Sequence, residues 1–107
     1  MWELKEWNIA CEYGIVRLHG LVYGRRPRFL DGESIHTSCI EKIEGRTVTT
    51  TSGSVYELGP ASQFFKDRYN TTNLEDIPYA NQKVDLDAED LTQLVDKEKI
   101  DEYTSTA

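Results

Sequence analysis

The side chains best suited to metal binding or nucleophilic chemistry are His19, His36, Cys11 and Cys39. Structural zinc sites take two close pairs of such ligands, and only His36 and Cys39 are close in this chain. On a strand these two side chains point to opposite faces unless the backbone bends between them. A nucleophilic cysteine also needs a base and a third group that orients the base, and the spacing assembles neither. We therefore expect buried thiols, no metal, no cofactor and no catalytic residue, and the chain is not expected to be an enzyme.

A basic loop offers a different chemistry. Arg25, Arg26 and Arg28 stand on either side of a proline and precede Phe29. Arginines beside an exposed aromatic ring suit phosphate contact and base stacking. Arg46 is a further candidate for the same surface. The loop could bind nucleic acid, an acidic partner protein or the acidic part of its own chain.

Negative charge is concentrated after residue 60. The whole chain has a net charge of −7, and residues 60–107 carry eleven Asp and Glu against five Lys and Arg. Residues 1–59 are nearly balanced, with eight acidic against seven basic side chains. Nucleic-acid binders usually show a basic domain, which counts against that function. The acidic segment could instead present charge to a basic groove, or serve only as a solvated face. Its candidate partner-binding carboxylates are Asp85, Asp87, Glu89 and Asp90.

The first 59 residues predict short strands separated by tight turns. Val16, Leu18 and Val22 alternate with more polar neighbours, a period of two that is typical of a half-buried strand. The apolar phase changes near Glu6 and again at Ile40, which indicates two bulges or bends. Five such strands predict a mainly β (α+β) fold, a small bent sheet or SH3-like barrel, because closure hides the sheet edges.

Residues 60–107 are expected to form an acidic, partly helical arm packed on this barrel. A short helix is predicted over 61–69, with Phe64 and Phe65 packed on the barrel. A second helix is predicted to begin at Asp87, because acidic residues in the first turn suit the helix dipole. Its apolar stripe would consist of Leu91, Leu94 and Val95.

The composition excludes a membrane-spanning protein. No apolar run approaches the roughly 18 residues that a transmembrane helix needs. The chain is charged from Glu3 onward, so its start does not form the apolar segment of a signal peptide. We expect a cytoplasmic protein without membrane contact.

Turn and strand-pairing residues recur in two segments, which read Arg28-Phe29-x-Asp31-Gly32-x-x-Ile35-x-Thr37-Ser38 and Thr49-x-Thr51-Ser52-Gly53-Ser54-x-Tyr56-x-Leu58-Gly59. This arrangement resembles a pattern in small uncharacterised proteins of bacteria and their phages. Phage and mobile-element proteins of this size are often inhibitors or adaptors of a host protein, including inhibitors of bacterial defence systems. The resemblance implies a protein partner and a bacterial cytoplasm.

The leading hypothesis is a non-catalytic protein-binding module, a phage or mobile-element inhibitor or adaptor acting on a host protein such as a defence-system component. One alternative is a small barrel that binds nucleic acid through the loop from Arg25 to Phe29. Another is a structural subunit that self-associates through a barrel edge. The residues expected to contact a partner are Arg25, Arg26, Arg28, Phe29, Asp85, Asp87, Glu89 and Asp90.

Overall fold

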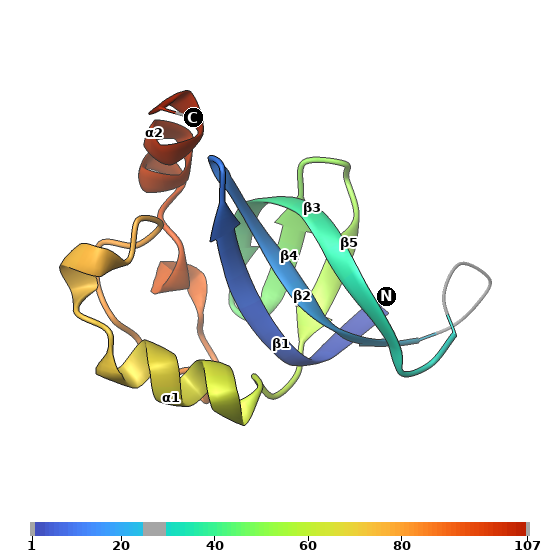
Figure 1. Ribbon diagram of the computed structural model, residues 1–107. Coiled ribbons are helices and arrows are strands. Elements are labelled where there is room, and N and C mark those ends of the chain that lie inside the picture. Colours follow the sequence, from blue (N-terminus) through green and yellow to red (C-terminus); the bar gives the residue numbers. More distant parts are fainter. Residues whose placement is uncertain (1, 25–29, 107) are drawn as a thin grey trace.

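Five strands close into a small barrel in the computed structural model, which describes residues 2–24 and 30–106 (Figure 1). They are β1 (Trp2–Glu12), β2 (Ile15–Tyr23), β3 (Glu33–Glu44), β4 (Thr47–Thr50) and β5 (Val55–Leu58). Consecutive strands pair antiparallel, and β5 pairs parallel with β1 to close the barrel. The closure is parallel because an odd number of alternating strands leaves the first and last pointing the same way. The predicted five-stranded barrel with a helical arm is confirmed.

Among the described strands, register shifts interrupt three pairings, including β2 with β3 between Arg17 and His19, and two of the three were predicted. The β1–β2 register shifts beside Glu6, whose φ is 52°. The extra residue turns Leu4, Trp7 and Ile9 toward the core, although strict alternation would divide them between two faces. The β3–β4 register shifts just after Ile40. Both predicted phase changes are confirmed.

Gly20 on β2 lies against the bulge of β1. A Cβ atom at this position would lie 3.0 Å from Leu4 Cγ, 3.0 Å from the Lys5 carbonyl oxygen and 3.1 Å from Trp7 Cα. Two of these are backbone atoms, so a methyl group forces β1 to move. We expect Gly20→Ala to lower the free energy of unfolding by about 1–3 kcal/mol, measured by urea denaturation. An unchanged urea midpoint would contradict this close approach.

The arm after β5 contains α1 (Gln63–Thr71), the short 3₁₀ turns η1 (Leu74–Asp76) and η2 (Thr92–Leu94), and α2 (Lys97–Thr106). In Figure 1 the arm starts below the barrel and runs along one side of it to α2 at the top. Its buried apolar side chains belong to the same core as those of the strands. They include Tyr69, Ile77, Tyr79, Ala80, Leu86, Leu91, Leu94, Val95 and Ile100. No helix within the described ranges is long and apolar enough to cross a membrane.

Arg46, between β3 and β4, ties the arm to the barrel. Its guanidinium donates to the carbonyls of Leu58 and Gly59 at the end of β5, at 2.8 and 2.6 Å. It also donates to the carbonyls of Leu86, at 3.4 Å, and Ala88 in the arm. One half-buried side chain therefore satisfies backbone acceptors from two segments that are distant in sequence.

The prediction that a helix begins at Asp87 is wrong. The chain from Asp87 to Leu91 forms turns, and α2 begins only at Lys97. Two carbonyls at this position bind Arg46, and the Leu91 N–H donates to the Gly45 carbonyl at 2.7 Å. Because these groups bind the barrel, they do not form the regular i to i−4 ladder of a helix.

The helix α2 starts where a side chain caps it. The carboxylate of Asp96 accepts the N–H groups of Glu98 and Lys99 at 2.9 and 3.2 Å, the arrangement of an N-cap. The expected apolar stripe is nevertheless buried, on the 3₁₀ turn η2 and its flanks instead of on a helix. Its members are Leu91, Leu94 and Val95.

Candidate functional site

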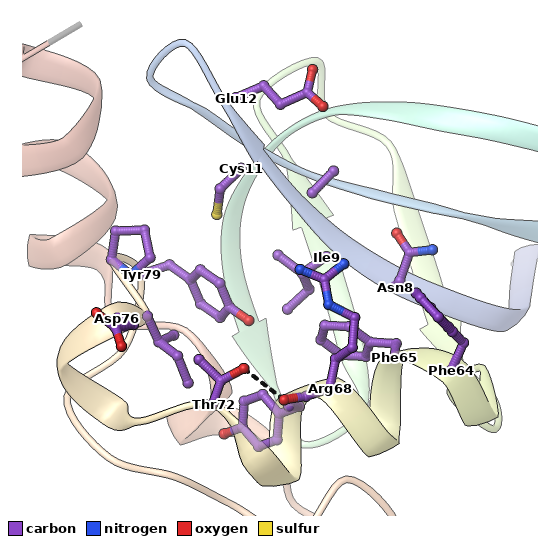
Figure 2. A pocket seen from close by; sticks show the side chains of 14 residues that line it. Asn8, Ile9, Cys11, Glu12, Phe64, Phe65, Arg68, Thr72, Asp76 and Tyr79 are labelled. Atoms are coloured by element: carbon purple, nitrogen blue, oxygen red, sulfur yellow. Dashed lines mark hydrogen bonds between the residues drawn. The ribbon is translucent and has the colours of Figure 1, made fainter.

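A cleft of about 370 Å³ lies between β1 and the beginning of the arm (Figure 2). Residues 8–12 of β1 line one side of it, and α1 and residues 76–79 line the other. All five consecutive residues of this part of β1 line the cleft, although their side chains alternate between two faces of the sheet. The cleft therefore runs along the edge of the strand, where the backbone of all five residues is accessible.

Along the cleft, no strand of residues 2–24 or 30–106 lies beside that edge of β1. β5 pairs with β1 only from Trp2 to Leu4, and an isolated bridge joins Trp7 to Ala61. The Ser62 N–H donates to the Trp7 carbonyl at 2.9 Å. Beyond Trp7, the described part of the chain supplies no further backbone partner on this side.

The geometry of the β1–β2 turn identifies the backbone groups that face the cleft. Tyr13 and Gly14 have φ values of 52° and 76°, as in a two-residue type I′ turn. The pair of residues flanking such a turn exchanges both of its hydrogen bonds, and this pairing alternates along the ladder. The N–H and C=O groups of Ile9 and Cys11 therefore point away from β2, toward the cleft.

The opposite wall is held in place by aromatic packing and hydrogen bonds. The Phe65 ring lies 5.7 Å from the Trp7 ring and 5.8 Å from the Tyr69 ring, centroid to centroid. Ser62 caps α1 by accepting the Phe65 N–H at 3.1 Å. The Tyr69 hydroxyl accepts the Val84 N–H at 3.0 Å. These contacts hold α1 at its distance from β1.

Arg68 is the charged side chain that reaches into the cleft. Figure 2 shows it extending from α1 toward β1, whereas the carboxylates of Glu12 and Asp76 lie at the ends and turn outward. Its guanidinium carbon lies 5.8 Å from the ring centroid of Phe64, which is 72% exposed. The predicted packing on the barrel is thus confirmed for Phe65 and wrong for Phe64, because adjacent residues of a helix do not share a face.

Cys11 lies half-buried in the cleft, and burial raises the pKa of its thiol to about 11. We expect iodoacetamide to alkylate it about a hundredfold more slowly at pH 8 than an unfolded cysteine, because the thiolate is the reactive form. The rate should keep rising toward pH 11, while that of the urea-unfolded chain levels off earlier. The Cys39→Ser variant isolates this thiol, and equal rates in the folded and unfolded chains would contradict the prediction.

The four carboxylates predicted to contact a partner are all exposed: Asp85, Asp87, Glu89 and Asp90. Three of them also make local contacts. Asp87 pairs with Lys66 at 2.8 Å, and Asp85 accepts the Asp87 N–H at 3.0 Å. Hydrogen bonds from Thr92 lower the pKa of Asp90. They therefore stabilise the turns that precede η2, and their contact with a partner stays a prediction.

The basic loop predicted as a second contact lies outside the described residues, with Arg25, Arg26, Arg28 and Phe29. Arg46, a further candidate for that surface, instead donates to the backbone carbonyls that join β5 and the arm.

His19 and His36 lie side by side on neighbouring strands, away from the cleft. Their rings stack with centroids 4.2 Å apart, and His19 Nε2 lies 2.9 Å from Ser34 Oγ. Burial, then the neighbouring His36 and Arg17, lowers the pKa of His19. Within residues 2–24 and 30–106, no three His, Cys, Asp or Glu side chains are arranged to hold a metal ion.

Sequence reasoning missed the cleft. Residues 8–12 have the pattern of an ordinary strand, and a strand's own sequence does not state which of its edges is paired. Phe64 and Arg68 lie four residues apart on the predicted helix and therefore on the same face of it. This solvent-facing pair was the sequence feature that could have indicated a binding surface.

In comparison with known proteins, no protein-family model, curated protein or solved structure matches this chain.

Proposed function

We propose that this chain is a non-catalytic protein-binding module that receives part of a partner protein in the cleft beside β1. The observation that carries the proposal is the free strand edge of residues 8–12, facing a cleft with a fixed opposite wall. An unpaired edge is a ready template for pairing with another chain. The exposed ring of Phe64 beside the cleft supplies the aromatic contact that protein interfaces favour.

The chemistry of the cleft supports binding more than catalysis. No histidine is among the described residues that line it. Burial raises the pKa of its thiol, Cys11, to about 11, which lowers the thiolate fraction at neutral pH further below that of an ordinary cysteine. Apolar, aromatic and polar side chains line the cleft together with the exposed guanidinium of Arg68, and they offer shape, apolar area and charge for recognition.

The resemblance of two segments to phage proteins supports a choice of partner class. On this basis the proposed partner is a host or phage protein, such as a component of a bacterial defence system, and the proposed role is that of an inhibitor or adaptor in the bacterial cytoplasm. An inhibitor of this kind needs no catalytic group, because occupying a surface of its target is sufficient.

Site-specific photo-crosslinking in bacterial lysate tests the proposal. A benzophenone side chain replaces Phe64 at the cleft or, as the control, Thr51 at the exposed turn between β4 and β5. We expect a discrete protein adduct from position 64 only, suppressed by excess wild-type chain. The captured protein, once purified, should form a stoichiometric complex with the wild-type chain.

Four outcomes would overturn this function. Equal adducts from both positions, or none from either, would remove the cleft as a binding site. An adduct between two copies of this chain would favour the self-associating subunit, and an adduct with DNA or RNA would favour the nucleic-acid alternative.

A further inference from the structure

We infer that the cleft takes an extended segment of the partner as an added strand on β1, with an acidic side chain of that segment opposite Arg68. This inference rests on the proposed function and gives its binding mode and the chemistry of the ligand. Strand addition is an established way for a sheet edge to recognise a peptide.

The backbone of β1 supplies the first part of this recognition. Ile9 and Cys11 direct their N–H and C=O groups to the cleft, and residues 8–12 extend for about 17 Å at the rise of a strand. A partner strand of four or five residues can pair with them without disturbing β2, because the neighbouring residues Asn8 and Ala10 make the bonds to β2.

The opposite wall limits the occupant to a single strand. α1 and residues 76–79 stand beside the edge, and the cleft measures about 370 Å³. This is the lower part of the range for ligand sites, about 300–1,000 Å³. A second copy of this chain would bring its own α1 to the same edge, so the two walls would compete for one space. A flexible terminus or loop of another protein has no such wall.

Arg68 sets the charge of the occupant. Among the described residues, its guanidinium forms no ion pair. It lies beside the Phe64 ring, and a guanidinium can bind a carboxylate through two parallel hydrogen bonds. Glu12 and Asp76 at the ends of the cleft repel further acids there (Figure 2). The favoured segment therefore carries one Asp or Glu near its centre.

The inner side of the cleft selects apolar side chains. Ile77 and Tyr79 are buried beneath it, and Cys11 has its sulfur directed inward in Figure 2. Side chains of an added strand alternate between two faces, so its inward positions would contact these groups. We expect a short alternating pattern of apolar and polar residues around the acid.

Selection of random octapeptides displayed on phage, with the full chain as bait, tests the charge. The wild-type chain should select peptides with a central Asp or Glu. Arg68→Glu should weaken a selected synthetic peptide about tenfold or more and select Lys or Arg in its place. Lys42→Glu makes the same charge change at an exposed site on β3 and should leave binding unchanged. No acidic preference, or no effect of Arg68→Glu, would overturn the charge assignment.

Amide hydrogen exchange, measured by NMR with the selected peptide, tests the strand pairing. The amides of Ile9 and Cys11 should become protected at least tenfold on binding, while those of Asn8 and Ala10, already paired with β2, should change little. A peptide that binds without protecting Ile9 and Cys11 would overturn strand addition.

The two proposals fail separately. If the photo-crosslinked partner still binds at position 64 but no peptide is selected, or Ile9 and Cys11 stay unprotected in its complex, strand addition is wrong and the binding function stands. If neither partner nor peptide binds, both are wrong.

Discussion

A chain truncated after Gly59 is expected to be unfolded, although it retains every strand of the barrel. The arm closes the core with Leu91 and Leu94, both 0% exposed, and α1 covers Trp7 with Phe65. A domain of about 60 residues is marginal even with a complete core. Far-UV circular dichroism and the dispersion of amide NMR signals measure the result. Cooperative urea unfolding of the truncated chain would show that the barrel folds without the arm.

A point substitution in the full chain measures how much the arm contributes to the stability of the core. Leu94→Ala should lower the free energy of unfolding by about 2–5 kcal/mol, because it leaves a cavity between arm and barrel. Leu74→Ala is the matched control, since Leu74 lies in the same arm but is 36% exposed, and should cost well under half as much. Equal costs for the two leucines would show that Leu94 does not lie in a shared core.

Replacing Arg46 is expected to produce a second large loss, of about 3–5 kcal/mol in the free energy of unfolding for Arg46→Met. The substitution leaves four part-buried carbonyls without the guanidinium that joins them, two at the end of β5 and two in the arm. A lysine carries its donors on one nitrogen, so Arg46→Lys should recover only a minor part of this loss. Urea denaturation followed by tryptophan fluorescence provides the measurement.

Arg68→Met is the matched control for this prediction. It removes an exposed guanidinium from the same chain and should change stability by about 0.5 kcal/mol or less. A variant Arg46→Lys as stable as wild type would mean that charge alone, and not the planar array of donors, holds the arm.

Most of the barrel could be predicted because its signals are local. Val16, Leu18 and Val22 alternate with the period of a strand, and the phase changes at Glu6 and Ile40 mark two of the three register shifts in the described strands. Buried positions of a strand are apolar and exposed positions are polar, so the residue types in a run of ten residues are enough to indicate which face of the strand is buried.

The arm was less predictable because distant groups decide its backbone. The segment after Asp87 has the residues of a helix start, yet its hydrogen-bonding groups bind Arg46 and Gly45, more than forty residues earlier in the chain. Local propensity is a weak prior that tertiary bonds override. The same contacts bury Leu91 and Leu94 on a 3₁₀ turn.

The amino-acid sequence by itself determined the strands, their inward faces, the turns and the uneven charge, because each depends on residues that are neighbours along the chain. Only the tertiary structure decided that β5 pairs with β1 no further than Leu4, and that α1 lies across from the edge left open. Whether a strand edge is free depends on which other segments pack beside it. The cleft and the position of Arg68 across from β1 therefore arise from the packing of segments some sixty residues apart, which no local pattern encodes.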